Sequence, residues 1–204
     1  MALPREQVTD GLLEELDRFE QLLRPLTDEE WATPSRCEGW TVGDVARHVV
    51  GSIADVAAGR VEGLGTPEVT EREVAERAGR SPAELADECA EVRKTAAGLL
   101  ALFDDAAWDG PSPGGYDGTL ADGVEALWYD TWLHADDIRA SLGRPSESGG
   151  GLAGAVSHVA FELRKRSQPD AVVGDPFTWV LVATGRADGS ALGGGAAAPA
   201  NIYA

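Results

Sequence analysis

Helical periodicity is the feature that most constrains the fold of this chain. In four long segments the apolar residues recur every three or four positions, with charged residues on the opposite face. Thr41 with Asp44, and Ser81 with Glu84, form the capping pairs that begin two of these segments. Amphipathic helices bury their apolar faces against one another, so the pattern predicts a helical bundle. The four segments span approximately residues 4–25, 41–56, 81–103 and 119–142.

The remainder of the chain is less regular. Residues 152–166 have a helical pattern with a basic last turn, which favours a fifth helix. Residues 177–183 alternate and are rich in β-branched and aromatic side chains, which predicts a strand. We therefore expect two parts: a helical bundle over residues 1–145, and over residues 146–204 a short α/β tail that packs on the bundle.

Two short segments of the sequence resemble each other. Residues 28–35 and 104–112 both combine acidic residues with a tryptophan that precedes a Pro-Ser pair, and both stand before a long helical segment. This echo fits a bundle built from two similar helical hairpins. Between them, residues 59–79 are rich in Gly and Glu and weakly periodic, which predicts a loop with a short helix that begins at Glu71.

The charge of the chain excludes some classes of partner. The sequence has 35 acidic and 17 basic residues, a net charge of −18. This field repels phosphate backbones and anionic lipids, so we expect neither nucleic acid nor membrane as a partner. No basic-then-apolar leader and no apolar run of about 18 residues is present, which favours a cytoplasmic location. Cys37 and Cys89 are too few for a disulfide framework.

Asp130 and His134 are the strongest candidates for chemistry. They stand four residues apart in the longest helical segment, so they lie on one face and can offer two ligands to one metal ion. His48 lies on the apolar face of another predicted helix. We interpret His48, Asp130 and His134 as ligands of a divalent metal inside the bundle; the alternative is a solvated Asp130 and a hydrogen-bonded core His134. His158, the third histidine, is a weaker candidate.

The residues that follow His134 have two interpretations. Asp137 lies one turn further along the same helix, where it can hold the imidazole of a ligand histidine. The alternative is an exposed charged helix end that Asp137 shares with Asp136 and Arg139.

Three other side chains near these candidates leave alternatives open. Trp128 and Trp132 flank the apolar stripe of the same helix, either as core residues or as walls of a substrate site. Cys37 stands in a polar loop, either as a reactive thiol or as a small half-buried residue. The sequence assigns no catalytic side chain.

These residues give the chain a family resemblance. It resembles the DinB-like superfamily and, within it, the metal-binding domain of the mycothiol-dependent maleylpyruvate isomerase family. The resemblance covers nearly the whole chain and is most specific in residues 31–48 and 128–145. The matching pieces are Trp31, residues 37–48 (CEGWTVGDVARH), Asp130, residues 134–143 (HADDIRASLG), and the tail residues 183–188 and 201–203.

The resemblance implies a fold and a metal site. It implies a DinB-like four-helix bundle in which His48, Asp130 and His134 hold a divalent metal, typically zinc or nickel. In the isomerases the carboxylate ligand is a glutamate. Asp130 is one methylene shorter, which leaves two outcomes open: coordination with an altered geometry, or a weaker or different metal.

The resemblance also implies a reaction. The bound metal would hold a low-molecular-weight thiol, mycothiol, as a thiolate that attacks a small electrophile, in an isomerase or an S-transferase. The partners would then be a thiol and an electrophilic substrate, and a homodimer is left open. Two alternatives stand beside this enzyme: a metal-dependent hydrolase, and a DinB-like protein that binds a small molecule without catalysis.

Overall fold

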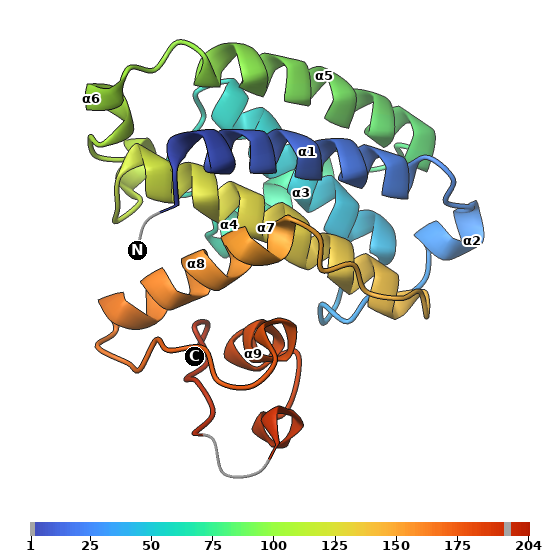
Figure 1. Cartoon of the computed structure of the whole chain (residues 1–204). Helices are drawn as coiled ribbons and strands as arrows, with labels where there is room; N and C mark the ends of the chain where they lie inside the picture. Colours follow the sequence, from blue (N-terminus) through green and yellow to red (C-terminus); the bar gives the residue numbers. More distant parts are fainter. Residues whose placement is uncertain (1–2, 194–196) are drawn as a thin grey trace.

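Four long helices form the centre of the structure, as the periodicity predicts. The computed structural model describes residues 3–193 and 197–204. The four helices are α1 (Arg5–Leu23), α3 (Val42–Ala57), α5 (Pro82–Leu100) and α7 (Leu120–Ser141). Both α1 and α3 pack against α5 and α7, so the four helices enclose one core (Figure 1). The predicted helical bundle is confirmed.

The sequence echo corresponds to a repeated piece of structure. Two four-residue helices, α2 (Asp28–Trp31) and α6 (Asp105–Trp108), each end on a buried tryptophan. After each of them the chain makes one isolated antiparallel bridge and enters a long helix, α3 or α7, through a Thr-Asp capping box. The two halves of the bundle therefore begin their ligand-bearing helices in the same way. The bridges pair Pro34 with Thr41 and Pro111 with Thr119.

A shorter helix, α4 (Pro67–Glu76), covers one side of α3. It begins four residues before the predicted start at Glu71, because Thr66 caps it and a proline occupies its first turn. The close approach of α4 depends on Gly51, where an added Cβ would lie 2.7 Å from the Cβ of Glu73. Gly51 thus allows Glu73 to reach the buried face of α3.

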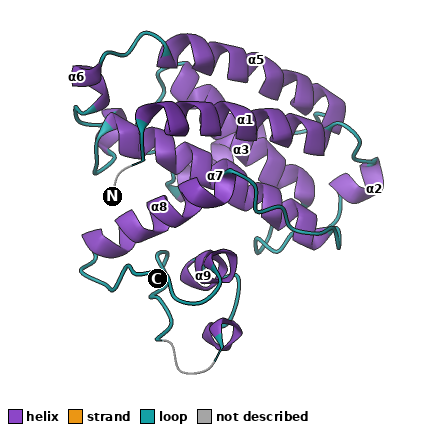
Figure 2. Cartoon of the chain, in the orientation of Figure 1, coloured by secondary structure: helices purple, strands orange, loops and turns teal. Residues whose placement is uncertain are grey.

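The tail is helical, and the predicted strand at residues 177–183 is wrong. The chain forms α8 (Gly151–Lys165) and α9 (Pro176–Ala183), and residues 3–193 and 197–204 contain no strand (Figure 2). The Asp175 carboxylate accepts a hydrogen bond of 2.9 Å from the Thr178 N–H and so caps α9. In a short apolar run, hydrophobic periodicity alone does not distinguish a helix from a strand. The capping residue Asp175 is the local signal that indicates a helix here. Two 3-10 turns complete the elements, η1 (Pro113–Gly115) and η2 (Gly189–Leu192).

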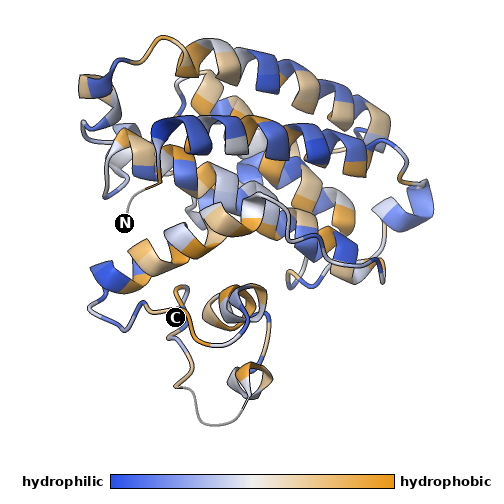
Figure 3. Ribbon diagram, in the orientation of Figure 1, coloured by the Kyte–Doolittle hydropathy of each residue, from blue (hydrophilic) through white to orange (hydrophobic). Residues whose placement is uncertain are grey.

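The helix α7 belongs to two apolar clusters. Trp128 lies in the cluster of the bundle, and Trp132 lies in a second cluster that α7 forms with α8, α9 and the end of the chain. Both indoles are 2% exposed, so they are core residues and do not form the walls of a substrate site. Because α7 joins both clusters, the division of the chain at residue 145 stays a prediction. Figure 3 shows hydrophilic residues along the outer faces of α1 and α5.

None of the described helices combines the length and apolar character that a membrane-spanning helix requires.

Candidate metal centre

The structure brings the three predicted ligands together. His48 comes from α3, and Asp130 and His134 come from α7; one ligand atom of each lies within 4.8 Å of the other two. The Nε2 atom of His48 is 3.6 Å from Oδ2 of Asp130, and Nε2 of His134 is 3.4 Å from Oδ1. The two imidazoles meet edge to face, with ring centroids 5.2 Å apart. Helix α7 offers two ligand positions and α3 offers one.

These separations suit a small cation between the three side chains. An N–H to carboxylate hydrogen bond has a length of about 2.7–3.2 Å, so both Nε2 atoms stand too far from Asp130 for a good one. Two donors bound to one tetrahedral zinc ion at about 2.1 Å lie roughly 3.4 Å apart. The donor set of two imidazoles and one carboxylate is also a common catalytic zinc set. The residues present therefore fit a divalent metal.

Glu73 holds the first histidine. Its Oε2 atom is 2.8 Å from Nδ1 of His48, and its side chain is 1% exposed. A carboxylate on Nδ1 fixes the tautomer of the imidazole and directs the lone pair of Nε2 toward Asp130. Sequence analysis did not identify Glu73. The sequence signal that could have identified Glu73 is the helix start formed by Thr66 and Pro67. A helix that begins there places Glu73 about two turns along α4.

Asp137 holds the second histidine in the same way. Its Oδ2 atom is 2.8 Å from Nδ1 of His134, and its side chain is completely buried. Asp136 and Arg139 are buried as well, so the alternative of an exposed charged helix end is wrong. The proposed contact between Asp137 and His134 is confirmed. Both histidines thus carry a carboxylate on Nδ1 and turn Nε2 toward Asp130.

Two arginines that the sequence analysis did not single out secure Asp137. Arg186, which follows α9, donates to both carboxylate oxygens at 2.8 and 2.7 Å, and Arg36 donates to Oδ1. Arg36 also pairs with Asp136 at 2.5 Å. The Arg186 contact joins residues 49 positions apart in the chain, and the Arg36 contacts join residues about 100 positions apart. Local sequence periodicity does not predict contacts at such separations.

Cys37 also lies beside this pair. Its Sγ atom is 3.3 Å from Oδ2 of Asp137 and 3.9 Å from Nδ1 of His134. A second ion could in principle take Cys37, His134 and Asp137 as ligands. The two guanidinium groups on Asp137 already neutralise that carboxylate, so the Nε2 side of His134 is the better candidate position for a cation. Cys37 is half-buried and lies within reach of the candidate site.

The connected network carries an excess of negative charge. Among the described residues, the four carboxylates of the network pair with two guanidinium groups, those of Arg36 and Arg186. Burial alone would raise the pKa of Asp130, but His134 and then His48 outweigh burial and lower it to about 2. Burial would lower the pKa of His134, but Asp130 raises it well above its ordinary value. The site therefore attracts positive charge. The four carboxylates belong to Glu73, Asp130, Asp136 and Asp137.

His158 takes no part in the cluster. It is buried on α8, and its ring stacks on Tyr129 with centroids 4.4 Å apart. Burial lowers the pKa of His158 to about 4, so the imidazole is neutral at neutral pH. His158 is therefore a packing residue between α7 and α8.

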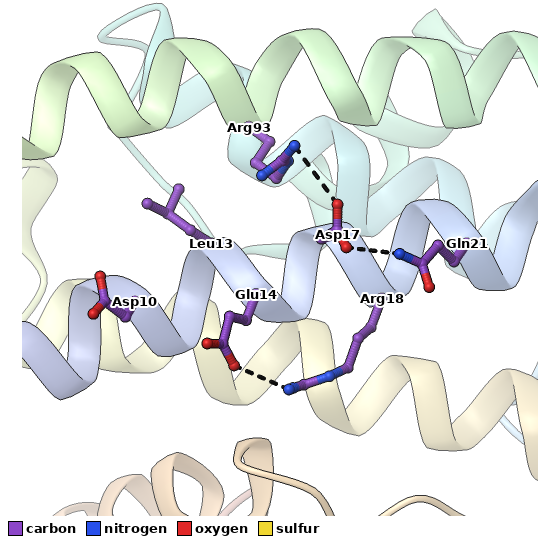
Figure 4. Close-up of a pocket in the computed structure, with 7 residues that line it drawn as sticks. All are labelled: Asp10, Leu13, Glu14, Asp17, Arg18, Gln21 and Arg93. Atoms are coloured by element: carbon purple, nitrogen blue, oxygen red, sulfur yellow. Dashed lines mark hydrogen bonds and ion pairs between the residues drawn. The ribbon is translucent and has the colours of Figure 1, made fainter.

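A surface hollow on α1 is separate from the metal centre (Figure 4). Two ion pairs lie within it: Arg18 is 3.0 Å from Glu14, and Arg93 of α5 is 3.6 Å from Asp17. These pairs indicate a solvated charged surface. The hollow is lined by Asp10, Leu13, Glu14, Asp17, Arg18, Gln21 and Arg93.

Comparison with known proteins identifies similar chains. Two crystal structures share the fold: that of the mycothiol-dependent maleylpyruvate isomerase, at 17% identity, and that of a histidine-to-alanine mutant of this isomerase, at 16% identity. Each has a TM-score of 0.65 and covers 97% of this chain and 96% of the other. No curated protein matches the sequence. Residues 12–139 match the family described as "Mycothiol maleylpyruvate isomerase N-terminal domain".

Proposed function

Because the chain belongs to the mycothiol maleylpyruvate isomerase N-terminal domain family, we propose that it is a metal-dependent enzyme that activates a low-molecular-weight thiol, mycothiol. The observation that carries this proposal is the convergence of His48, Asp130 and His134. Three protein ligands leave a coordination position open, which is typical of catalytic sites rather than structural ones. Two nitrogens and one carboxylate suit zinc or nickel.

The side chains around the ligands prepare this site. Glu73 and Asp137 accept hydrogen bonds from the Nδ1–H groups, so both histidines keep their Nε2 lone pairs free for the metal. A divalent ion bound there supplies Lewis acidity and keeps a thiol in its thiolate form at neutral pH. The indole of Trp40 packs beside His48, with ring centroids 5.4 Å apart and the ring planes tilted by 58°.

The thiolate would attack a small electrophile. In an isomerase its sulfur would add to a carbon of a double bond conjugated with a carbonyl group, the π electron pair would move into an enolate, and the former double bond could rotate as a single bond. The enolate pair would then reform the double bond while the C–S bond breaks and the sulfur leaves with its electron pair as thiolate. In an S-transferase the sulfur instead displaces a leaving group, which departs with the electron pair.

Cobalt substitution tests the proposal. We expect the cobalt(II) protein to develop a near-ultraviolet thiolate-to-metal band when a thiol is added. The band should be absent in His48→Ala. Because Cys37 lies close to the site and could itself supply sulfur, the titration is repeated in Cys37→Ser, where the band should persist.

The same titration separates the alternatives. A cobalt spectrum that no thiol changes, together with metal-dependent hydrolysis, would favour the hydrolase. A protein that folds and binds small molecules equally well without metal would favour the binding protein. Either result would refute the thiol enzyme.

A further inference from the structure

Helix α4 is attached to the bundle mainly by polar side chains. Glu73 is the buried residue of α4, and no residue of Pro67–Glu76, all of which the structure describes, belongs to either apolar cluster. Arg77, which follows α4 directly, is 5% exposed. A helix with few buried apolar contacts opens locally at a lower free energy than the helices of the core. The polar contacts of α4 therefore decide how firmly it is docked on α3.

Charged groups of α3 and α5 hold this helix. Arg72 of α4 pairs with Asp55, a completely buried residue of α3. Arg77 donates two hydrogen bonds, of 3.1 and 2.8 Å, to Glu88 of α5. Both acceptors are carboxylates of the bundle, and both donors move with α4.

Each of these carboxylates has a second arginine outside α4. Arg60, which lies before α4, donates from Nε to Asp55 at 3.0 Å. Arg80, which lies after α4, pairs with Glu88. If α4 left α3, Asp55 and Glu88 would each keep one guanidinium partner. Undocking of α4 therefore leaves no unpaired charge at these two positions.

The turns at both ends of α4 permit such a movement. Gly65 precedes the capping residue Thr66 and has a φ of 79°, and Gly79 follows Arg77 by two positions and has a φ of 80°. Among the described residues, nothing beyond the chain neighbours lies within 4 Å of a Cβ built at either glycine. Both glycines stand between α4 and the arginines that stay behind, so the segment between them can move as one unit.

Glu73 links this segment to the metal centre. Its Oε2 atom accepts the Nδ1–H bond of His48 at 2.8 Å, and within the described part of the chain it is the hydrogen-bond partner of Nδ1. An ion on Nε2 draws electron density from the imidazole, which makes Nδ1–H a stronger donor to the carboxylate. Undocking of α4 removes this acceptor. Unlike Asp55 and Glu88, His48 has no second partner to replace it.

The size of the coupling follows from linkage. A carboxylate that holds a metal-ligating histidine raises metal affinity by about 10- to 100-fold. The docked state has this carboxylate on His48 and the undocked state does not, so the two states bind the ion with affinities that differ by this factor. Thermodynamic reciprocity then requires that a bound ion raise the ratio of docked to undocked α4 by the same factor.

We propose that α4 is a movable cover whose docking on α3 is stabilised by a metal ion bound at His48, Asp130 and His134, through the contact between Glu73 and His48. The inference rests on the proposed function, because it assumes an occupied metal centre. It makes α4 a regulatory element: an event that undocks α4 lowers the metal affinity, and loss of the metal loosens α4.

Hydrogen–deuterium exchange of the whole protein tests this coupling. Mass spectrometry follows the backbone amides of Pro67–Glu76 with excess chelator and with increasing zinc. We expect zinc to slow this exchange by about 10- to 100-fold and the effect to reach a plateau when the site is saturated. Slowing through global unfolding would instead continue to grow with zinc concentration. In Glu73→Gln the effect at saturation should fall below about threefold, whereas the matched control Glu76→Gln should keep all of it.

Competition with a chelator reports zinc binding independently and so separates this inference from the proposed function. If the wild type binds zinc but the exchange of α4 is unchanged, slows without a plateau, or slows equally in Glu73→Gln, the coupling is refuted while the metal centre stands. If the wild type binds no zinc, the metal centre of the proposed function fails and the coupling fails with it.

Discussion

Replacement of Glu73 by glutamine should lower the metal affinity of the site and leave the free energy of unfolding of the metal-free protein almost unchanged. Glu73 touches no proposed ligand atom; it acts only through Nδ1 of His48, at 2.8 Å. Its other oxygen, Oε1, is buried and has no hydrogen-bond partner among the described residues. Glutamine has the same shape and can still accept the Nδ1–H bond, but it lacks the charge that strengthens that bond and polarises the imidazole.

The expected effects on the two properties differ. Loss of a carboxylate that holds a metal-ligating histidine reduces metal affinity by about 10- to 100-fold, or about 1.4–2.7 kcal/mol. In the metal-free protein, relief of a buried charge offsets the weaker hydrogen bond. We therefore expect the free energy of unfolding without metal to change by less than about 1 kcal/mol.

Two measurements check this expectation. Competition with a chelator gives the affinity for zinc, and denaturant unfolding with excess chelator gives the stability without metal. Glu76→Gln is the matched control: it is the same substitution on α4, at a half-exposed glutamate that lies 3.4 Å from Arg72. Its zinc affinity should equal that of the wild type. Equal affinities for Glu73→Gln and Glu76→Gln would refute the assignment of Glu73.

Three further predictions concern other parts of the account. Asp130→Asn should lower zinc affinity more than about 100-fold in the chelator assay, and Asp130→Glu should recover most of it, because a carboxylate is again present. Gly11→Ala should cost about 1–3 kcal/mol in denaturant unfolding with zinc affinity unchanged, since its Cβ would lie 2.3 Å from the Trp128 ring. Burial raises the pKa of Glu125 from 4.5 to about 7, so the folded protein holds that proton more tightly and loses this stability as pH rises between these values. Glu125→Gln should match the wild type near pH 4.5 and be more stable by up to about 3 kcal/mol at pH 8.

Each of these predictions has a contrary result. Full zinc affinity in Asp130→Asn would remove Asp130 from the ligand set. Wild-type stability in Gly11→Ala would show that α1 does not pack on Trp128 as closely as described. A stability difference that does not change with pH in Glu125→Gln would show that Glu125 titrates normally in the folded protein.

Much of the bundle could be predicted from the sequence because its signals are local. The capping pairs at Thr41 and Ser81 mark helix starts that depend on a few neighbouring residues. The pairing of Asp130 with His134 follows from helix geometry alone. That His48 lies opposite them follows from its place on the apolar face of α3, which must face the core.

The partners of the ligands could not be predicted in the same way. Glu73 reaches His48 only because Gly51 lets α4 approach α3, and that contact depends on packing rather than periodicity. Arg186 reaches Asp137 from the end of α9, a segment that sequence analysis predicted as a strand. Local sequence patterns do not predict tertiary contacts of this kind.

The most direct test of the metal centre is elemental analysis of the purified protein beside His48→Ala and His134→Ala. His158→Gln is the control, because His158 lies on α8 away from the ligand atoms. We predict about one divalent ion per chain in the wild type and in His158→Gln, and almost none in the two alanine variants. A folded wild type that takes up no zinc or nickel on reconstitution, or alanine variants that keep a full complement, would contradict the account.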